Sequence, residues 1–419
     1  MGLLPALLAL APHVASAQPK PAPKPPYLAN ITVPPPFKCW VVADNIGQAR
    51  HLVLTPRNGM YVRLAELKNG FGTVYLKHSE QSDTWVVAKR FGNFTGTGIA
   101  LDADYLYTTS NTEVFRYKLD AKGEVLNPDK PECIVTGLVD KGQHGSKSIT
   151  LDGKGHIYVA IGAPSNNCQE QDRTQGSPGM QPCGMLDSVG GVWQFATDKL
   201  NQRLKDGVRY ATGLRNVVGL DWNQQTNSLF VMQHGRDQLG YLYPKLYDDK
   251  KSAETPAECM FEIRQPGDDA GWPYVYYDLA EKKKMISPEY GGDGKTSSDK
   301  YLDPVQAFPA HMAPNAVVFQ NDGKFPVEYR EGAFIAFHGS WNRSPEPQEG
   351  YYVAFQPFKD GKPNGPWKVF ADGFAGPRPV LSPGKAVHRP CGLAFGPDGA
   401  LFVSDDVKGT IYKIRVFVP

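Results

Sequence analysis

Short polar clusters stand directly before several apolar, strand-like runs, and their residue types could do chemistry. His144 precedes one run, and an imidazole can serve as a general base because its pKa lies near physiological pH. Taken alone, His144 favours a plainer interpretation, a loop histidine bonded to a backbone carbonyl. Arg215 and Asn216 precede another run, and a guanidinium followed by an amide suits a planar ligand with carboxylates and carbonyl oxygens.

Three further clusters stand at comparable places. Gly235 and Arg236 follow a run, and a glycine there exposes backbone carbonyls, which are good Ca²⁺ ligands. Arg389 directly precedes the last run, just as Arg215 and Asn216 directly precede an earlier one. Two basic loops at equivalent positions indicate an anionic ligand between them. His338 and Arg343 follow the fifth run and are placed to add to the same site.

The elements that must position these clusters form an internal repeat. Each copy is an apolar strand, a turn of Asp, Asn or Gly, and an aromatic strand, and a single hairpin of this kind cannot bury both faces. Six copies occur, at residues 51–62, 98–107, 148–159, 218–231, 316–336 and 392–403. They predict an all-β, six-bladed β-propeller over residues 37–419, with the ligand site at one mouth of the central channel. A β-sandwich, the alternative, is expected to have fewer strands and no fixed repeat.

The spacing of the copies predicts where the propeller carries insertions and how it closes. Longer gaps leave room for insertions around 168–183, around 241–297 and after 338. The terminal run 410–418 can close the ring beside an N-terminal strand.

Charge and the N-terminus limit the classes of partner and compartment. The 45 basic and 43 acidic residues are interspersed, with a net charge of +2, which predicts neither nucleic-acid binding nor membrane insertion. An apolar run at 3–12 and small residues at 15–17 indicate a signal peptide over 1–17, although no Lys or Arg precedes the run. A proline-rich segment over 18–36 follows and disfavours a buried N-terminal helix. We therefore expect secretion to the extracellular space, or to a periplasm.

Six cysteines, all beyond residue 17, fit an oxidising compartment. Cys168 and Cys183 flank a polar loop, which favours a disulfide between them. Two more bridges could form among the remaining four cysteines, whose pairing the sequence leaves open: Cys39, Cys133, Cys259 and Cys391. Sequons begin at Asn30, Asn93 and Asn342 and suit a secreted glycoprotein.

The order of the motifs resembles the PQQ-dependent glucose/sorbosone dehydrogenases, and especially the PQQ domains of secreted fungal pyranose dehydrogenases. His144 lies thirteen residues before an Ile-Tyr pair and is followed by Gly-x-Arg-Asn-x-x-Gly-Leu from Gly213. Next come His-Gly at His234, Gly-Trp-Pro at Gly271, and Arg-Pro-x-Gly-Leu-Ala from Arg389. The resemblance covers the chain from about Gly47 onward.

The resemblance implies a role for each cluster. His144 would be the catalytic base that takes the proton of the anomeric hydroxyl while hydride passes to the quinone of PQQ. Arg215, Asn216 and Arg389 would bind PQQ, and the backbone carbonyls of the Gly235–Arg236 pair would hold Ca²⁺. The substrate would be a small sugar, and a cytochrome or another extracellular redox protein would accept the electrons, since no haem attachment motif is present.

Some residues depart from the family pattern. Val218 stands where glucose-active members have glutamine, and Arg236 stands where they have proline, which favours pyranoses or 2-keto-aldoses over glucose. The family lysine at the quinone has no clear equivalent, so His338, Trp341 or Arg343 would serve, and Arg50 is a further cofactor-binding candidate. Two other functions remain open for a six-bladed propeller, a Ca²⁺-dependent lactonase and a binding module without catalysis.

Overall fold

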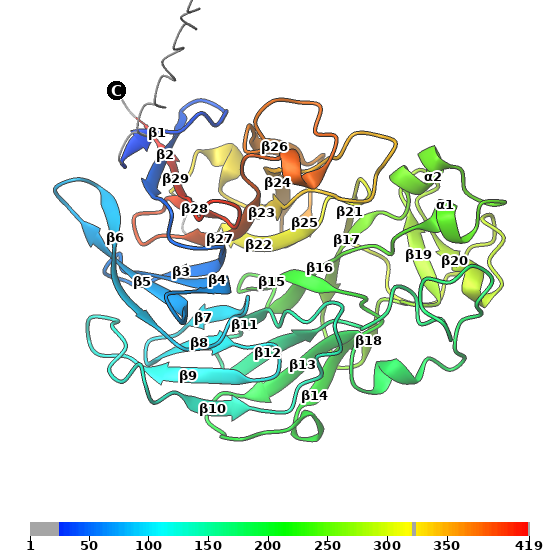
Figure 1. Ribbon diagram of the computed structural model, residues 1–419, viewed down its shortest axis with the longest axis horizontal. Coiled ribbons are helices and arrows are strands. Elements are labelled where there is room, and N and C mark those ends of the chain that lie inside the picture. The colour runs from blue at the N-terminus through cyan, green and yellow to red at the C-terminus, as the bar shows by residue number, and fades with distance from the viewer. Residues whose placement is uncertain (1–24, 321–323, 418–419) are drawn as a thin grey trace, which may run out of the picture.

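Strands make up almost all of the regular structure. The structure is a computed structural model that describes residues 25–320 and 324–417. Within these ranges the α-helices are two short ones, α1 (Leu239–Leu242) and α2 (Asp249–Glu254), and neither has the length or apolarity to cross a bilayer. The sheets radiate around a common centre (Figure 1). The prediction of an all-β, six-bladed propeller is confirmed.

The first three blades follow one another along the chain, each an antiparallel sheet. The first blade consists of β3 (Ala49–Leu54), β4 (Met60–Lys68), β5 (Phe71–Ser79) and β6 (Thr84–Phe91). The second consists of β7 (Ile99–Leu101), β8 (Tyr105–Thr109), β9 (Val114–Lys118) and β10 (Glu132–Val135). The third consists of β11 (Ile149–Leu151), β12 (His156–Ile161), β13 (Gly191–Ala196) and β14 (Val208–Thr212), with β18 (Asp268–Asp269) added in parallel at its outer edge.

Strands from distant segments complete two of the last three blades, the fourth and the sixth. The fourth consists of β15 (Val217–Asn223), β16 (Ser228–Gln233), β17 (Glu258–Ile263) and β21 (Gln306–Phe308). The fifth consists of β22 (Pro314–Gln320), β23 (Gly332–Phe337), β24 (Tyr352–Lys359), β25 (Lys362–Pro363) and β26 (Lys368–Ala371). The sixth consists of β27 (Pro390–Phe395), β28 (Leu401–Asp405), β29 (Ile411–Val416), β2 (Phe37–Ala43) and β1 (Tyr27–Leu28).

The first strand of every blade faces the centre. β3, β7, β11, β15, β22 and β27 contact one another in that order, and β27 returns to β3, so the ring is closed. Together they line a channel of about 240 Å³. Each of the six repeat copies supplies the first two strands of one blade, so the loops at the ends of these strands meet at the mouths of the channel.

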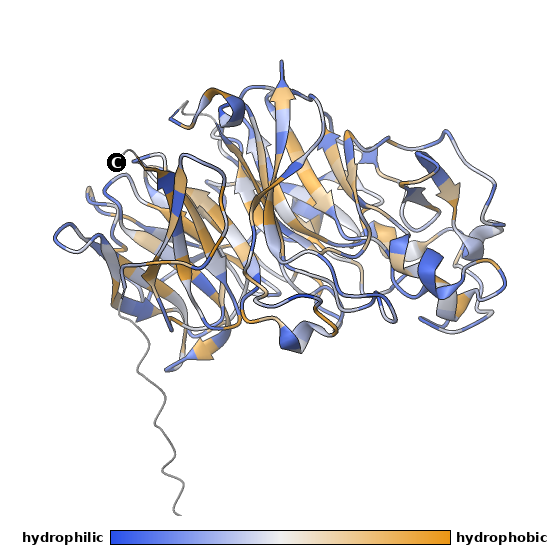
Figure 2. Cartoon of the chain, turned by 90° about the horizontal axis from the view of Figure 1, so that it is seen from above, coloured by the Kyte–Doolittle hydropathy of each residue, from blue (hydrophilic) through white to orange (hydrophobic). Residues whose placement is uncertain are grey.

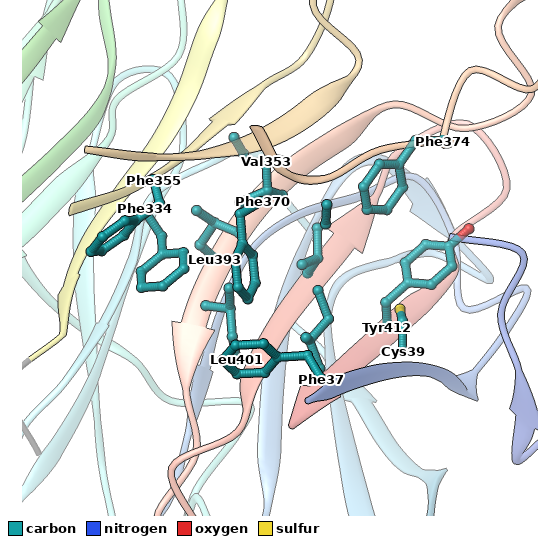
Figure 3. Close-up of a cluster of buried hydrophobic side chains, with 14 of the residues drawn as sticks. Phe37, Cys39, Phe334, Val353, Phe355, Phe370, Phe374, Leu393, Leu401 and Tyr412 are labelled. Atoms are coloured by element: carbon teal, nitrogen blue, oxygen red, sulfur yellow. The ribbon is translucent and has the colours of Figure 1, made fainter. Parts of the chain in front are cut away.

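Ring closure joins the two ends of the described chain in the sixth blade. β2 pairs with β29 in antiparallel register, Phe37 opposite Val416 and Cys39 opposite Ile414. Phe37 is 4% exposed, and its ring packs edge-on against Phe370 of the fifth blade, 5.0 Å between centroids. Figure 3 shows this aromatic cluster between the fifth and sixth blades. Burial of a large apolar side chain contributes about 1.5–3 kcal/mol to the free energy of unfolding. β2 therefore stabilises the closed ring through side-chain packing as well as through strand pairing.

The turns of the repeat follow from their residue types. In the third copy, Gly153 has φ +71°, a left-handed conformation that costs glycine little. The Asp152 carboxylate accepts from the backbone N–H groups of Lys154 and His156, at 2.7 and 3.1 Å, and fixes the turn. Hydrophobic residues follow the strands inward, while the peripheral loops are largely hydrophilic (Figure 2).

The predicted insertions are present. The segment between β16 and β21 carries α1, α2 and a two-stranded sheet of β19 (Val275–Asp278) and β20 (Lys283–Ile286), which projects from one side of the propeller (Figure 1). The loop that leads from β12 to β13 is fastened by the Cys168–Cys183 disulfide, as predicted.

The prediction that two further disulfides could form is wrong. Cys39, Cys133, Cys259 and Cys391 are free. Cys39 and Cys391 share the sixth blade but lie on β2 and β27, three strand positions apart, or about 14 Å at the usual strand spacing. A disulfide needs Cα atoms within about 7 Å. Cys133 and Cys259 lie on two other blades. The proposed signal peptide, 1–17, lies outside the described residues.

Candidate functional site

Four of the nine predicted site residues meet in one pocket at a mouth of the channel. His144 precedes β11, Arg215 and Asn216 precede β15, and Gly235 follows β16. All four line one pocket of about 300 Å³. Other residues that line it are Gln143, Arg173, His234, Asp237, Glu258, His311, Ala313, Ser340, Trp341 and Asn342.

His144 is held as a neutral base. Its Nδ1 lies 2.5 Å from the Ala163 carbonyl oxygen, which can only accept, so Nδ1 carries the hydrogen and Nε2 does not. Burial and the nearby Arg215 guanidinium lower the pKa of His144 to about 3. No described residue bonds Nε2. The plainer interpretation, a ring bonded to a backbone carbonyl, is correct for Nδ1, and it leaves Nε2 available to take a proton.

Arg215 is buried, and the protein itself uses most of its donors. Nε donates to the Asn166 carbonyl (3.1 Å), Nη1 to the Gly235 carbonyl (2.8 Å), and Nη2 to Asn166 Oδ1 (3.1 Å) and Asp237 Oδ2 (2.7 Å). Arg215 therefore fixes the loops around the pocket and adds positive charge to its wall. It has little capacity left for direct bonds to a ligand.

Asn216, unlike Arg215, has a side-chain oxygen that no described residue bonds. The residue is 8% exposed, and its Oδ1 is buried without a partner in the described part of the chain. Nδ2 lies 3.5 Å from His234 Nδ1, at the limit of a hydrogen bond. An unpaired buried acceptor is costly, so we expect a ligand or water to donate to Asn216 Oδ1.

Two carboxyl groups in the pocket were not among the predicted site residues. Asp237 accepts from Arg215, from Arg173 Nη2 (2.9 Å) and from Asn342 Nδ2 (2.6 Å). Burial alone would raise its pKa, but Arg215, His311 and Arg173 together lower it to about 2. Glu258 accepts from the backbone N–H groups of Gly235 and Ala313, and burial raises its pKa to about 7. Asp237 directly follows the Gly235–Arg236 pair, which is a sequence signal, whereas Glu258 is the first residue of β17 and has none.

The predicted calcium residues point in different directions. The Gly235 carbonyl faces the pocket wall and already accepts from Arg215. The Arg236 side chain turns away, and its Nη1 donates to Glu289 Oε2 at 2.5 Å, with both side chains almost fully buried. Only the backbone of Arg236 is therefore a candidate ligand.

Arg50, His338 and Arg389 form a second charged group around Asp406. The Asp406 carboxylate accepts from His338 Nε2 (2.8 Å) and Arg50 Nη1 (3.0 Å). Arg389 donates from Nε to the His338 carbonyl (3.0 Å) and from Nη2 to the Gly339 carbonyl (2.6 Å). Burial would raise the pKa of Asp406, but His338, Arg50 and Arg389 outweigh it and hold that pKa well below its usual range. The group adjoins the pocket, because residues 340–342 of the same loop line it.

The His338, Asp406 and Cys391 ligand atoms lie within 4.8 Å of one another, a spacing that could hold a metal ion. The Arg50 guanidinium on the same carboxylate opposes a cation there. The group is better suited to an anion that faces its arginines.

Arg343 lies apart from this arrangement. Nη1 donates to the Ala253 carbonyl (2.6 Å) and Nε to the Pro347 carbonyl (3.0 Å), and Arg343 does not line the pocket. The sequon at Asn342 is also unsuited to a glycan, since this side chain is bonded to Asp237 inside the site. Asn30 and Asn93 are exposed.

Comparison with known proteins places these features in a family context. The TrAA12-like family model matches residues 31–416. A PQQ-dependent sugar dehydrogenase of Hypocrea jecorina is 21% identical over 378 residues, 85% of this chain and 81% of that protein. A PQQ-dependent pyranose dehydrogenase of Coprinopsis cinerea is 28% identical over 235 residues, 48% of this chain and 30% of that protein. The chain spans half or less of the length of the first curated relatives that it matches.

The fold is also shared with solved structures. The calcium structure of a Trichoderma reesei enzyme of carbohydrate-active family AA12 has a TM-score of 0.74 at 18% identity, and the match covers 92% of this chain and 97% of that one. These likenesses confirm the resemblance to PQQ-dependent sugar dehydrogenases that the sequence motifs indicated.

Proposed function

The chain belongs to the TrAA12-like family, and on that premise we propose that it is a PQQ-dependent sugar dehydrogenase that oxidises the anomeric carbon of a pyranose or a 2-keto-aldose. The observation that carries this proposal is His144, a neutral imidazole with a free Nε2, in a pocket bordered by arginines.

The mouth of the channel fits a cofactor with three carboxylates. Arg50 Nη2 and Arg389 Nη1 have no hydrogen-bond acceptor among the described residues, although the other nitrogens of both guanidinium groups are bonded. Fixed guanidinium groups with spare donors suit carboxylates. Asn216 Oδ1 and His338 complete the polar lining that would face the cofactor. When bound, PQQ would supply the quinone that accepts the hydride.

The residues of the chain account for the proton. His144 Nε2 would accept the proton of the substrate hydroxyl, while the Nδ1–H bond to Ala163 holds the ring in one orientation. The negative charge of Asp237 acts to raise the pKa of His144, so it would stabilise the imidazolium once it forms. Arg215 and Arg173 fix Asp237 in place.

We assign a Ca²⁺ ion to the backbone carbonyls of Gly235 and Arg236. Asp237 is already paired with Arg215 and Arg173, so the support for calcium is the set of oxygen atoms that line the pocket, which is the ligand type that calcium prefers. The Gly235 carbonyl would have to share its oxygen between the ion and Arg215, which its two lone pairs permit. The similar Trichoderma reesei structure is itself a calcium structure.

The remaining expectations extend this proposal. We propose that residues 1–17 direct secretion, that residues 37–419 are the catalytic domain, and that an extracellular cytochrome or similar protein takes the electrons. Val218 follows Val217 at a bulge of β15 and replaces the glutamine of glucose-active enzymes, which supports a substrate other than glucose.

The test is reconstitution of the purified chain with PQQ and Ca²⁺, with dye reduction measured on a panel of pyranoses and 2-keto-aldoses. We expect saturable activity that needs PQQ and is lost when EGTA removes calcium. The same preparation without PQQ should not hydrolyse lactones. Lactone hydrolysis without any quinone, together with no PQQ-dependent dye reduction, would instead support the lactonase alternative.

A further inference from the structure

A groove of about 470 Å³ lies between the disulfide-closed loop and the insertion that follows β16. This insertion projects from one side of the propeller (Figure 1). None of the residues that line the groove lines the pocket around His144. The groove is lined by Gln181, Pro182, Tyr274, Val275, Ile286, Tyr290, Ser298, Lys300 and Tyr301. Three of these nine are tyrosines, none of them fully buried, which is the composition of a ligand groove rather than of a core.

The tyrosine rings are arranged as fixed faces. Tyr274 and Tyr301 are parallel to within 9°, with centroids 6.2 Å apart, and Tyr290 packs edge-on against Tyr274 at 4.8 Å. The Tyr274 hydroxyl accepts from the backbone N–H of Cys183 (2.9 Å), and the Tyr290 hydroxyl donates to the Cys168 carbonyl (3.3 Å). Both rings are thus tied to the two ends of the disulfide-closed loop.

Tyr301 is held in an unfavourable backbone conformation. Its φ is +77°, a region that a bulky residue rarely occupies. Lys284 Nζ donates to its carbonyl (2.8 Å), and the ring covers Gly271, where a Cβ atom would come within 2.9 Å of Tyr301 Cγ. Strain of this kind persists where the surroundings enforce it and clusters at ligand sites.

The rim of the groove is polar. The Lys300 ammonium lies 4.9 Å from the Tyr301 ring centroid, and Lys300 makes no ion pair with any residue that the structure describes. Gln181 is exposed, and its side chain likewise has no hydrogen bond within the described ranges. Lys300 and Gln181 therefore place hydrogen-bonding groups beside the tyrosine rings.

We propose that this groove is a second carbohydrate subsite, which binds a pyranose ring of an oligosaccharide against Tyr301 and Tyr274. The C–H face of a pyranose is apolar and its edge carries hydroxyl groups, so it matches an aromatic face with a polar rim. Lys300 and Gln181 would bond the hydroxyls. The inference rests on the proposed function only for its class of ligand; the site performs no redox step.

Calorimetric titration of the full chain, with no PQQ added so that no turnover occurs, tests the subsite. The probes are cellohexaose, xylohexaose and maltohexaose. We expect at least one to bind with a dissociation constant at or below about 1 mM. Tyr301→Gly should weaken that binding by about tenfold or more, because it removes the ring while glycine accepts the positive φ without strain.

Two variants serve as controls. Tyr301→Phe keeps the ring face and should bind within about threefold of the wild type, since only the hydroxyl is lost. Tyr241→Ala removes an exposed tyrosine (62%) that does not line the groove. This variant should bind the hexasaccharide with the same dissociation constant as the wild type. No saturable binding of any hexasaccharide, or equal binding by Tyr301→Gly, overturns the subsite.

The outcome separates this inference from the proposed function. Hexasaccharide binding that depends on Tyr301, without any PQQ-dependent oxidation, leaves the subsite standing and refutes the dehydrogenase. PQQ-dependent oxidation of monosaccharides without hexasaccharide binding refutes the subsite alone.

Discussion

Replacing His144 by glutamine is expected to lower kcat of the PQQ- and Ca²⁺-loaded enzyme by about 100-fold or more, while PQQ affinity stays close to that of the wild type. Loss of a positioned general base typically costs two to four orders of magnitude. Glutamine is similar in size but cannot accept the proton that Nε2 would take. Steady-state dye reduction measures the rate, and a PQQ titration of the same protein measures affinity.

The matched control is His156→Gln. His156 is a partly exposed histidine at the start of β12, paired with Asp152, and it does not line the pocket. Its replacement should leave kcat unchanged. An H144Q enzyme with wild-type turnover would remove His144 from the mechanism.

The pH dependence of kcat/KM in the wild type is a second test of the role of His144. Burial and Arg215 lower the pKa of His144 to about 3, so the imidazole stays neutral and able to accept a proton as the pH falls through its ordinary value of about 6.5. A base with this pKa should place no acid limb near 6.5 in the kcat/KM profile. The same shift means that the unfolded chain binds a proton below about pH 6.5 that the folded chain does not, so His144 reduces stability as the pH falls.

Replacing Asp237 by asparagine is expected to lower the free energy of unfolding by about 3–5 kcal/mol, the usual cost when one partner of a buried ion pair is removed. Asp237 Oδ2 accepts from both Arg215 (2.7 Å) and Arg173 (2.9 Å), and Arg215 is 3% exposed. Asparagine keeps the shape but leaves the buried guanidinium without its counter-charge. Denaturant unfolding monitored by circular dichroism measures the change.

An exposed ion pair provides the comparison for this variant. Asp104 bonds Lys118 Nζ at 2.7 Å, but both side chains are largely exposed, and such pairs contribute little. Asp104→Asn should leave the unfolding midpoint almost unchanged. If Asp237→Asn is equally mild, the Arg215–Asp237 pair does not hold the site together as described.

The repeat allowed most of the propeller to be predicted from the sequence. A hairpin of two alternating strands with an Asp or Asn/Gly turn is a local feature, and all six copies are the first two strands of a blade. The outer strands were not predictable in this way. β18, for example, adds in parallel to β14 over a separation of more than 50 residues, and β21 returns to β17 after the whole insertion. These pairings depend on packing between distant segments.

The candidate site was predictable where it follows the repeat. His144, Asn216 and Gly235 lie at the ends of repeat strands, so closing the ring brings them into one pocket. Asp406 had a similar signal, because it follows the second strand of the sixth copy much as His234 follows that of the fourth. Arg343 follows the fifth copy at a greater distance, and its loop turns the guanidinium toward Ala253 instead.

The hydrogen-bond partners of a charged side chain could not be predicted from the sequence. Arg215 precedes β15 as predicted, yet most of its donors go to Asn166, Gly235 and Asp237. Asn166 lies in the loop between β12 and β13, just before the disulfide, and no periodicity describes the path of this loop. Sequence therefore located the arginine but not its role as a support for the pocket wall.

Equilibrium binding of PQQ tests the central claim, that the channel mouth is a PQQ site, most directly. Calorimetric titration of the calcium-loaded chain should give saturable binding at one PQQ per chain. Arg389→Gln should weaken it by about tenfold or more, as expected when a charge-assisted hydrogen bond is lost, and Arg415→Gln, at an exposed arginine of the last strand, should not. Absence of saturable PQQ binding to the wild type, or equal weakening by both substitutions, would contradict the account.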